Sequence, residues 1–297
     1  MAWTLAASGV QVLALEAGPA YSPEHDYLLH RPEWERQRFP YKPGSQGNYR
    51  FARMQELEER WSMLRSWNIV SGRSNRGERR IPSGPGYHHV RGVGGSALHL
   101  TGEAHRMHPR SMRMQSSYGV AADWPLSYAE LEPFYQEAES IIGVAGPADP
   151  GARWRSQPYP LPPHPLGKAS SLVQESGAAA GYTWVANSRA ALSQNYDGRP
   201  ACNYCANCNR GCPRRDKGSA DVTFIHKALA TGNLDLRSGC RLLKIAPDRG
   251  NRVKGISYLD QDDQERNIAC DILIMAAGAA TPEASAFFVR HTSGVIC

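Results

Sequence analysis

The sequence lacks the features that would place the protein in a membrane or on a nucleic acid. It has no run of about 18 apolar residues, the length that a membrane-spanning helix needs, and no basic segment of the kind that begins a signal peptide. The Lys and Arg residues behind the net charge of +6 are scattered among Asp and Glu. We expect no transmembrane segment and no nucleic-acid partner, and the compartment stays open between cytoplasm and periplasm.

A glycine-rich turn is also missing where the first strand would need one. Residues 11–20, QVLALEAGPA, have the pattern of a buried strand that ends in an acid, Glu16, before a Gly-Pro break. In a dinucleotide-binding unit such an acid binds ribose hydroxyls, and a G-x-G-x-x-G turn lies about 20 residues before it. That turn would lie upstream of Met1, so we expect the chain to begin within the first helix of the unit. Taken alone, the segment also fits any buried strand followed by a turn.

The elements that are present are typical of an α/β protein. A chain of 297 residues, 41% of them hydrophobic, is long enough for one large or two smaller lobes. A helix is predicted after Ser127, with Glu130 completing a capping box and an apolar face that contains Phe134. Other helices are predicted at 2–8, 54–64, 170–180 and 220–230, and strands at 10–15, 234–236, 241–245, 253–259 and 268–275. A Pro-rich linker, SQPYPLPPHPLGK, separates the two halves.

Two further segments contain runs of glycine and other small residues. Gly92, Gly94 and Gly95 with Ser96 form a loop that lets a ligand approach the backbone, where amide groups can meet a phosphate or the edge of a flavin ring. Residues 272–275 are predicted to be a buried strand that runs into the small residues 276–279, which would allow a cofactor to lie against the strand end. The glycine segment alone also fits an ordinary surface turn.

Four of the seven cysteines lie within residues 202–212. Their spacing, C-x2-C-x2-C-x3-C-P, is that of a bacterial ferredoxin loop, in which thiolates converge on an iron–sulfur cluster. The four are Cys202, Cys205, Cys208 and Cys212. We favour a cluster, with a structural zinc or with disulfides and free thiols as the alternatives. Cys240, Cys270 and Cys297 are expected to be buried or incidental thiols.

Taken in order, the motifs resemble the glucose-methanol-choline (GMC) oxidoreductases. The resemblance covers nearly the whole chain, residues 2–283, and is carried by LALEAGP, RGVGGSALH, WPLSYAELEPFYQEAESIIGVAG, CNYCANCNRGCPRRDKGSADVTFIHKAL, NLDLRSGCRLLKI and ILIMAAGAATP. The WPLSY stretch and the cysteine loop are most similar to the branch of bacterial gluconate and sugar dehydrogenase large subunits. The resemblance implies an FAD-dependent dehydrogenase that oxidises the CH–OH group of an alcohol, polyol or sugar by hydride transfer to flavin N5.

The same resemblance implies roles for particular residues. Glu16 would bind the adenosine ribose, the glycine loop would lie along the pyrophosphate and flavin, and Leu242 would offer backbone groups to the adenine. Ala277 and Gly278 would lie beside the cofactor, while Leu100 stands where many members have Asn. A three-iron (3Fe-4S) cluster would take Cys202, Cys208 and Cys212 and leave Cys205 spare, or as the fourth ligand of a 4Fe-4S cluster.

The implied architecture is an incomplete FAD-binding Rossmann-like domain with helical and loop insertions. It would lack the first strand and a C-terminal segment for substrate and catalysis. Its parts are a partial dinucleotide-binding βαβ unit at 1–20, FAD-covering loops and helices with the glycine loop 91–102 at 21–150, the Pro-rich linker and cysteine loop at 151–218, and a return to the FAD-binding domain at 219–297.

No residue of this chain is assigned as catalytic. A histidine is the base that alcohol oxidation needs, and the resemblance places it in the missing C-terminal segment, so the chain alone would be inactive. Five histidines flank the glycine loop and are expected to be structural, although the spacing of the last two also fits a metal pair: His88, His89, His99, His105 and His108.

Partners follow from the same resemblance. The substrate would be a small alcohol or sugar, and a cluster would pass electrons singly to an acceptor subunit such as a cytochrome. The alternatives to an active enzyme are an inactive flavoprotein fragment and a structural or binding domain that a zinc ion stabilises.

Overall fold

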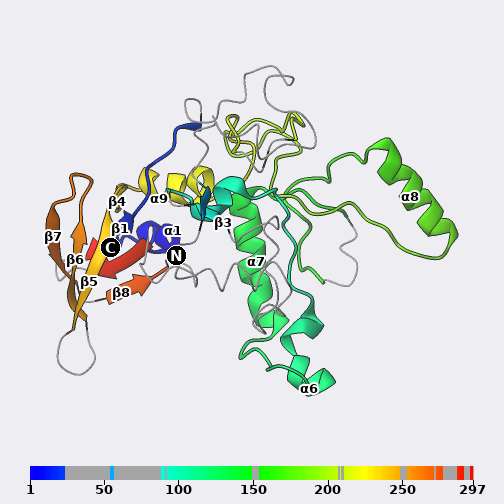
Figure 1. Cartoon of the computed structure of the whole chain (residues 1–297). Helices are drawn as coiled ribbons and strands as arrows, with labels where there is room; N and C mark the ends of the chain where they lie inside the picture. The colour runs from blue at the N-terminus through cyan, green and yellow to red at the C-terminus, as the bar shows by residue number, and fades with distance from the viewer. Residues whose placement is uncertain are drawn as a thin grey trace, which may run out of the picture. The chain divides into compact units, whose positions relative to one another are not determined.

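The chain folds into two units. The computed structural model describes residues 1–23, 92–148, 154–206, 208, 211–247, 253–270 and 272–276, and the course of the backbone at 54–56, 88–90, 286–290 and 295–296. The first unit combines Met1–His99 with Ile225–Cys297, and the second is Leu100–Phe224 (Figure 1). In the described part of the chain no helix is long and apolar enough to cross a membrane.

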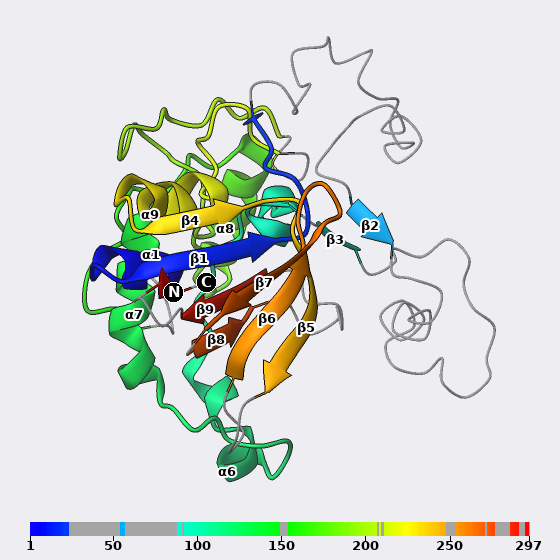
Figure 2. The same cartoon turned by 90° about the vertical axis from the view of Figure 1, so that its left-hand side faces the viewer.

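A five-stranded sheet organises the first unit. Its strand order is β4-β1-β10-β9-β8, and β1 runs parallel to β4 and β10 but antiparallel to β9 (Figure 2). The strands are β1 (Gln11–Glu16), β4 (Leu234–Arg237), β8 (Ile272–Met275), β9 (Ala286–Arg290) and β10 (Val295–Ile296). The strands predicted at 10–15 and 234–236 are therefore confirmed, within a sheet of mixed direction.

Strand β1 is buried on both of its faces. Val12 and Ala14 pack with Ala6 of α1 (Ala2–Ala7) and Ala228 of α9 (His226–Ala230). The alternate side chains, including Leu13, join a cluster on the opposite face. Successive side chains of a strand point to opposite faces of the sheet. A strand that is covered on both faces therefore needs a continuous run of apolar residues, which is what this segment has.

The opposite face of β1 meets a three-stranded antiparallel sheet. Its strands are β5 (Arg241–Pro247), β6 (Val253–Leu259) and β7 (Glu265–Ala269), in the order β5-β6-β7. Buried Ile256 and Tyr258 of β6 contact the apolar face of β1. The predicted strand at 268–275 is in fact two strands, β7 and β8, that belong to different sheets.

Two local predictions in the first unit are wrong. Met54–Glu56 forms strand β2, paired with β3 (His88–Val90), where a helix was expected; the rest of that expected helix lies outside the described residues. Strand β8 is not buried, since Ile272 is 44% exposed and Met275 61% exposed. An apolar run predicts that a strand forms but cannot specify what covers it.

The second unit is built around helix α7 (Tyr128–Ile142). Its start is as predicted: the Ser127 side chain accepts from the Glu130 N–H, and the Glu130 carboxylate accepts from the Ser127 N–H. Shorter elements are the 3-10 helices η3 (Gly95–His99, in the first unit) and η4 (Pro109–Met112), helix α6 (Met114–Tyr118) and the π-helical turn η6 (Asp221–Ile225). The turn η6 and α9 together form the helix predicted at 220–230.

The apolar face predicted for α7, with Leu131, Phe134, Tyr135 and Ala138, is only half-buried, and its placement of Phe134 is wrong. Phe134 is 66% exposed, whereas Tyr128, Glu132 and Glu139 are the buried residues of the helix. The helix therefore faces the interior of its unit with two carboxylates. Such burial is tolerated only where the charges are paired, and arginines supply the pairing.

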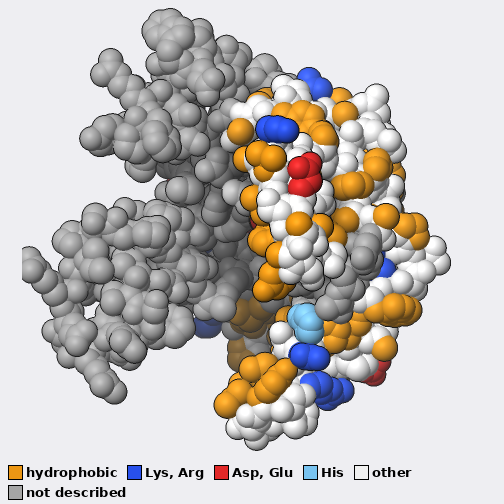
Figure 3. Space-filling view, turned by 90° about the vertical axis from the view of Figure 1, so that its right-hand side faces the viewer, with side chains coloured by type: hydrophobic (Ala, Val, Ile, Leu, Met, Phe, Trp, Pro, Cys, Tyr) orange, Lys and Arg blue, Asp and Glu red, His pale blue; other side chains and the backbone are white. Residues whose placement is uncertain are grey.

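Helix α8 (Lys168–Ala179) forms where a helix was predicted. Gly177 is its buried residue; a side chain there would lie 2.2 Å from the Trp184 ring, so the glycine allows that ring to lie against the helix. Leu172 and Val173 are each 48% exposed. Figure 3 views the side that carries α8 and shows hydrophobic side chains gathered in patches with few charged ones between them.

Candidate functional site

The end of β1 forms a tight turn around the acid that the sequence singles out. The Gly18 N–H donates to Glu16 Oε1 at 2.8 Å, which orients the carboxylate toward the turn. The Glu16 carbonyl accepts from the Cys240 N–H at 2.9 Å, and the Gly18 carbonyl accepts from the Gly239 N–H at 2.9 Å. The backbone thus fixes the acid between the turn and the segment that leads into β5.

The glycine loop lies directly against this turn. The Val93 N–H donates to the Pro19 carbonyl at 3.0 Å, and Leu98 is buried against Tyr21. A Cβ atom added at Gly92 would lie 2.4 Å from Tyr21 Cε2 and 3.1 Å from the Pro19 carbonyl oxygen. Only glycine allows the loop to approach the strand end this closely. Two segments about 75 residues apart in sequence are brought together, as a shared ligand site requires.

Backbone conformation explains the next two glycines. Gly94 has φ of 106° and Gly95 has φ of 56°, and the Gly95 N–H donates to the Gly92 carbonyl at 2.7 Å. A Cβ at Gly95 would meet no atom within 4 Å, so the left-handed backbone and not lack of space favours glycine there. Ser96, at the start of η3, is exposed.

The remaining predicted cofactor residues divide into two groups. Leu242 lies in β5, two residues after the Cys240 N–H that binds Glu16, and packs on the cluster formed with Leu13. The strand that carries it therefore begins beside the acid. Ala277 and Gly278 lie outside the described residues.

The four clustered cysteines have different surroundings. The Cys212 thiol donates to Asp216 Oδ1 at 3.2 Å; burial, followed by the negative charge of Asp216, raises the pKa of Cys212 to about 12. Cys202 and Cys208 line one cavity, and burial raises the pKa of both thiols. Cys205 is exposed. Cys240 and Cys270 are buried and in no disulfide, as expected, and Cys297 lies outside the described residues.

The predicted metal centre gains no support from this arrangement. Among the residues that the structure describes, no group of three or more His, Cys, Asp or Glu side chains is arranged to hold a metal ion. A cluster or a structural zinc needs three or four thiolates that converge on one point. The cysteine side chains as placed do not fit either group, because the Cys212 thiol donates to the Asp216 carboxylate and no three of the described groups converge on one point.

A buried lysine holds the cysteine loop. Lys217 is 1% exposed, and its ammonium donates to the Cys208 carbonyl at 2.8 Å and to the Leu100 carbonyl at 3.2 Å. Burial lowers the pKa of Lys217. The stretch RRDKGSAD looks like an ordinary polar loop, so no sequence pattern marks this residue as different from its neighbours.

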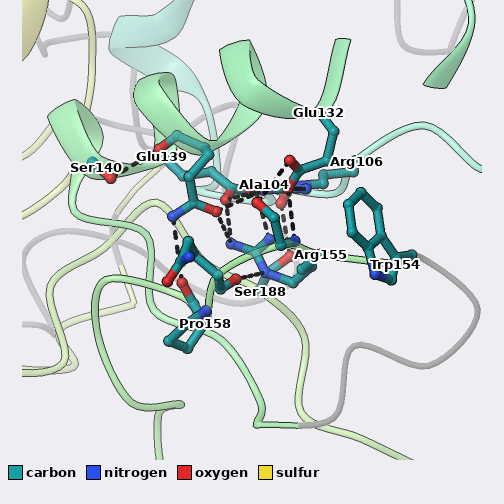
Figure 4. A network of polar contacts seen from close by, with 12 residues as sticks. Ala104, Arg106, Glu132, Glu139, Ser140, Trp154, Arg155, Pro158 and Ser188 are labelled. Atoms are coloured by element: carbon teal, nitrogen blue, oxygen red, sulfur yellow. Dashed lines mark hydrogen bonds and ion pairs between the residues drawn. The ribbon is translucent and has the colours of Figure 1, made fainter. Parts of the chain in front are cut away.

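A buried ionic network joins α7 to two other segments (Figure 4). Arg106 donates to both oxygens of Glu139 at 2.8 Å and to Glu132 at 2.9 Å. Arg155 also binds Glu139, and its guanidinium lies 3.6 Å from the centroid of the Tyr159 ring. Burial alone would raise the pKa of Glu139, but the hydrogen bonds from the two arginines outweigh it and hold that pKa below its usual value.

The histidines near the glycine loop have structural partners where their side chains are described. The Nε2 atom of His105 lies 3.1 Å from Glu103 Oε2, and Nδ1 of His108 accepts from the Arg110 N–H at the start of η4. The expectation of structural roles is consistent with these contacts. The side chains of His88, His89 and His99 lie outside the described residues.

Comparison with known proteins identifies related sequences. A family model described as GMC oxidoreductase matches residues 121–284. The chain is 31% identical over 201 residues to the fructose dehydrogenase large subunit of Gluconobacter japonicus, covering 65% of this chain and 36% of that protein. It is 30% identical over 195 residues to a 2-methyl-1,2-propanediol dehydrogenase of Mycolicibacterium austroafricanum, covering 64% and 35%.

A third relative belongs to the same group of oxidoreductases. The chain is 26% identical over 220 residues to the gluconate 2-dehydrogenase flavoprotein of Pantoea cypripedii, covering 63% of this chain and 36% of that protein. The chain therefore spans about a third of the length of the curated relatives it matches.

Proposed function

Because the chain belongs to the GMC oxidoreductase family, we propose that it binds FAD and serves an oxidoreductase that acts on the CH–OH group of an alcohol, a polyol or a sugar. Members of this family are FAD-dependent dehydrogenases or oxidases, and the relatives named above include enzymes for a sugar, a sugar acid and a diol. That this protein acts on a substrate of one of these classes is part of the same proposal.

The observation that carries the proposal is the contact between the end of β1 and the glycine loop. The Val93 N–H donates to the Pro19 carbonyl three residues beyond Glu16. A carboxylate at a strand end accepts hydrogen bonds from a ribose diol, and a glycine loop beside it offers backbone amides to a pyrophosphate. The residues present therefore fit the nucleotide half of FAD.

Each residue of the proposed site has one task. Glu16 would hold the ribose hydroxyls, while Gly92, Gly94, Gly95 and Ser96 would present the backbone to the pyrophosphate and flavin. Leu242 would meet the adenine through its backbone, and Ala277 with Gly278 would lie beside the cofactor. Bound FAD supplies the acceptor for a hydride from the substrate carbon. We assign no base to His105 or His108, because both serve the contacts given above.

Equilibrium titration with FAD tests the proposal on the chain as purified. Quenching of flavin fluorescence, with a shift of the flavin absorbance bands, is expected to saturate at one FAD per chain. Activity is read separately, from reduction of an artificial electron acceptor in the presence of fructose, gluconate or a diol. A folded chain, checked by circular dichroism, that leaves flavin fluorescence unchanged at millimolar FAD would contradict the proposal.

The route of electrons after the flavin is a separate proposal. The name of the fructose dehydrogenase large subunit implies an assembly for that protein, and we extend to this chain an acceptor subunit such as a cytochrome. The iron–sulfur relay rests on the cysteine spacing and on the family resemblance, so we derive no step through it. Analysis of iron and acid-labile sulfide in purified protein tests for the iron–sulfur cluster, and a zinc assay on the same sample tests for a structural zinc instead.

A further inference from the structure

The ammonium group of Lys217 joins two loops that lie far apart in the sequence. It donates to the Leu100 carbonyl at 3.2 Å and to the Cys208 carbonyl at 2.8 Å. Leu100 belongs to the end of the glycine loop 91–102, and Cys208 belongs to the cysteine loop 202–212. One side chain therefore holds a peptide group of each loop.

Burial makes these two contacts necessary. Lys217 is 1% exposed, and a buried charge is tolerated only where polar partners replace the water that it loses. An ammonium has three hydrogens to donate and no acceptor, so carbonyl oxygens are suitable partners. Removal of the ammonium would take a charged donor from both carbonyls at once. The lysine and the two loops therefore depend on one another.

The backbone that carries the lysine is itself held in place. Lys217 forms an antiparallel bridge with Ala191, and the Gly218 N–H donates to the Ala190 carbonyl at 2.8 Å. A Cβ atom at Gly218 would lie 2.4 Å from Cγ2 of Ile142, the last residue of helix α7. Glycine therefore lets the chain pack directly against the helix end. The lysine side chain thus extends from a fixed point.

The next two carbonyls of the glycine loop are held as well. The Thr101 carbonyl accepts from the guanidinium of Arg189 at 2.7 Å, and the Gly102 carbonyl accepts from the Ala190 N–H at 2.6 Å. With the carbonyl that binds Lys217, three consecutive peptide groups have fixed orientations. Lys217 extends this set of contacts to the cysteine loop.

We propose that Lys217 is a positioning residue of the flavin site and couples that site to the cysteine loop. The inference rests on the proposed function, in which the glycine loop lies along the pyrophosphate and flavin. Lys217 acts through the peptide group of Leu100, whose orientation sets how the glycine loop ends. A movement of the Cys208 carbonyl changes the position of the ammonium that both carbonyls share. Because coupling between two sites is reciprocal, FAD binding in turn stabilises the cysteine loop.

Substitution of the lysine tests its effect on the flavin. Lys217→Met removes the donor and keeps a long side chain, and it is expected to weaken FAD binding about tenfold, as loss of a charged hydrogen-bond donor does. The visible circular dichroism of the flavin that still binds is expected to change, because it reports the orientation of groups around the ring. Lys217→Arg keeps a cationic donor and is expected to bind FAD more tightly than Lys217→Met.

Arg106→Met is the matched control. Arg106 is a cation of the same unit and is 2% exposed, but its partners Glu132 and Glu139 belong to helix α7 and to neither loop. The variant is expected to lose stability and to bind FAD with the affinity and spectrum of the parent. Each full-length variant is titrated under conditions in which far-ultraviolet circular dichroism shows it to be folded. A general loss of stability would affect both variants alike.

Hydrogen exchange without FAD tests the link between the loops. In Lys217→Met, peptides that cover 97–105 and 202–208 are both expected to exchange faster than in the parent, while 128–142 is unchanged. If this variant does not fold, the parent chain provides the test: FAD is expected to slow exchange in 202–208 as well as in 97–105, and to leave 168–179 unchanged.

Three results would overturn the inference. They are a folded Lys217→Met that binds FAD like the parent, an Arg106→Met that loses FAD affinity to the same extent, and exchange that responds in one loop but not in the other. A parent chain that binds no FAD would count against the proposed function instead. The exchange measurement without FAD would still decide whether Lys217 joins the two loops.

Discussion

At the scale of single residues, the proposed cofactor site depends on one carboxylate and on backbone geometry. Glu16 is oriented by the Gly18 N–H, and Gly92 lies where any side chain would collide with Tyr21. The side chain of Glu16 and the absence of one at Gly92 therefore serve the same site. A substitution at Glu16 changes only the carboxylate, and a substitution at Gly92 changes only the space beside Tyr21.

Glu16→Gln is expected to weaken FAD binding about tenfold. A carboxylate that accepts a hydrogen bond contributes about 1.5–3 kcal/mol, and the neutral amide retains part of that interaction. The measurement is the dissociation constant from the fluorescence titration. Glu265→Gln, on exposed strand β7, is the control and is expected to bind FAD like the parent. An equal loss of affinity in both variants would remove Glu16 from the site.

Arg106→Met is expected to destabilise the second unit by about 3–5 kcal/mol, because it leaves Glu132 and Glu139 buried without their shared partner. Arg266→Met is the matched control, since its pair with Asp260 lies at the surface, where solvent screens the interaction, and its loss is expected to change the unfolding free energy little. Urea unfolding, followed by circular dichroism, gives both free energies. A similar small change in the two variants would show that the buried network contributes little.

At the scale of elements, the helices of the second unit differ in what supports them. Helix α7 has a capping box and a buried face that carries the ionic network, whereas α8 has Gly177 as its buried residue. An isolated helix of this length is marginal in water. The two helices should therefore differ in local stability.

Ser127→Ala is expected to cost about 1 kcal/mol, because it removes the acceptor for the Glu130 N–H at the start of α7. Ser170→Ala, in exposed α8, removes the same hydroxyl group at a position that caps no helix. Its effect on the free energy of unfolding is expected to be neutral or slightly stabilising. Thermal unfolding of both variants makes the comparison. Equal melting temperatures would mean that the cap contributes nothing measurable.

Hydrogen exchange should separate the two helices directly. Amides of α8 are expected to exchange far faster than those of α7, since few buried contacts oppose local opening of α8. Mass spectrometry of peptides from 128–142 and 168–179 measures both in one sample. Protection of α8 equal to that of α7 would reveal a partner surface on α8.

At the scale of the whole molecule, the buried carboxylates link stability to pH. The pKa of Glu139 and that of Glu132 are lowered from 4.5 in the folded protein, because hydrogen bonds from arginine outweigh burial. Their contribution is present above about pH 4.5 and is lost as the pH falls through the lower folded values. Unfolding free energies measured from pH 7 to pH 3 should fall most steeply below pH 4.5. Glu139→Gln should flatten that fall; an unchanged slope would contradict the linkage.

Local signals were sufficient for several elements and for the family. The acid at the end of an apolar strand, the capping box of α7 and the strands at 234–236, 241–245 and 253–259 lie where the sequence predicts them. The predicted GMC family is confirmed by the match over residues 121–284. These features depend on neighbours along the chain, and neighbours are what a sequence pattern records.

Other features depended on partners distant in the sequence. Phe134 is exposed and Glu139 buried because Arg106 and Arg155 approach α7 from outside the helix. Residues 54–56 form a strand because 88–90 pair with them. No local pattern contains either fact.

The sequence by itself determined the chemical types that this protein brings to a site: a strand-end acid, a flexible glycine loop and a run of thiols. Only the tertiary structure decided how they are grouped. It placed the Gly92 loop against the turn after Glu16, and it turned Cys202 and Cys208 toward one cavity while binding Cys212 to Asp216. The physical reason is that spacing along a chain fixes which groups are available, whereas packing and hydrogen bonds between distant segments fix which of them meet.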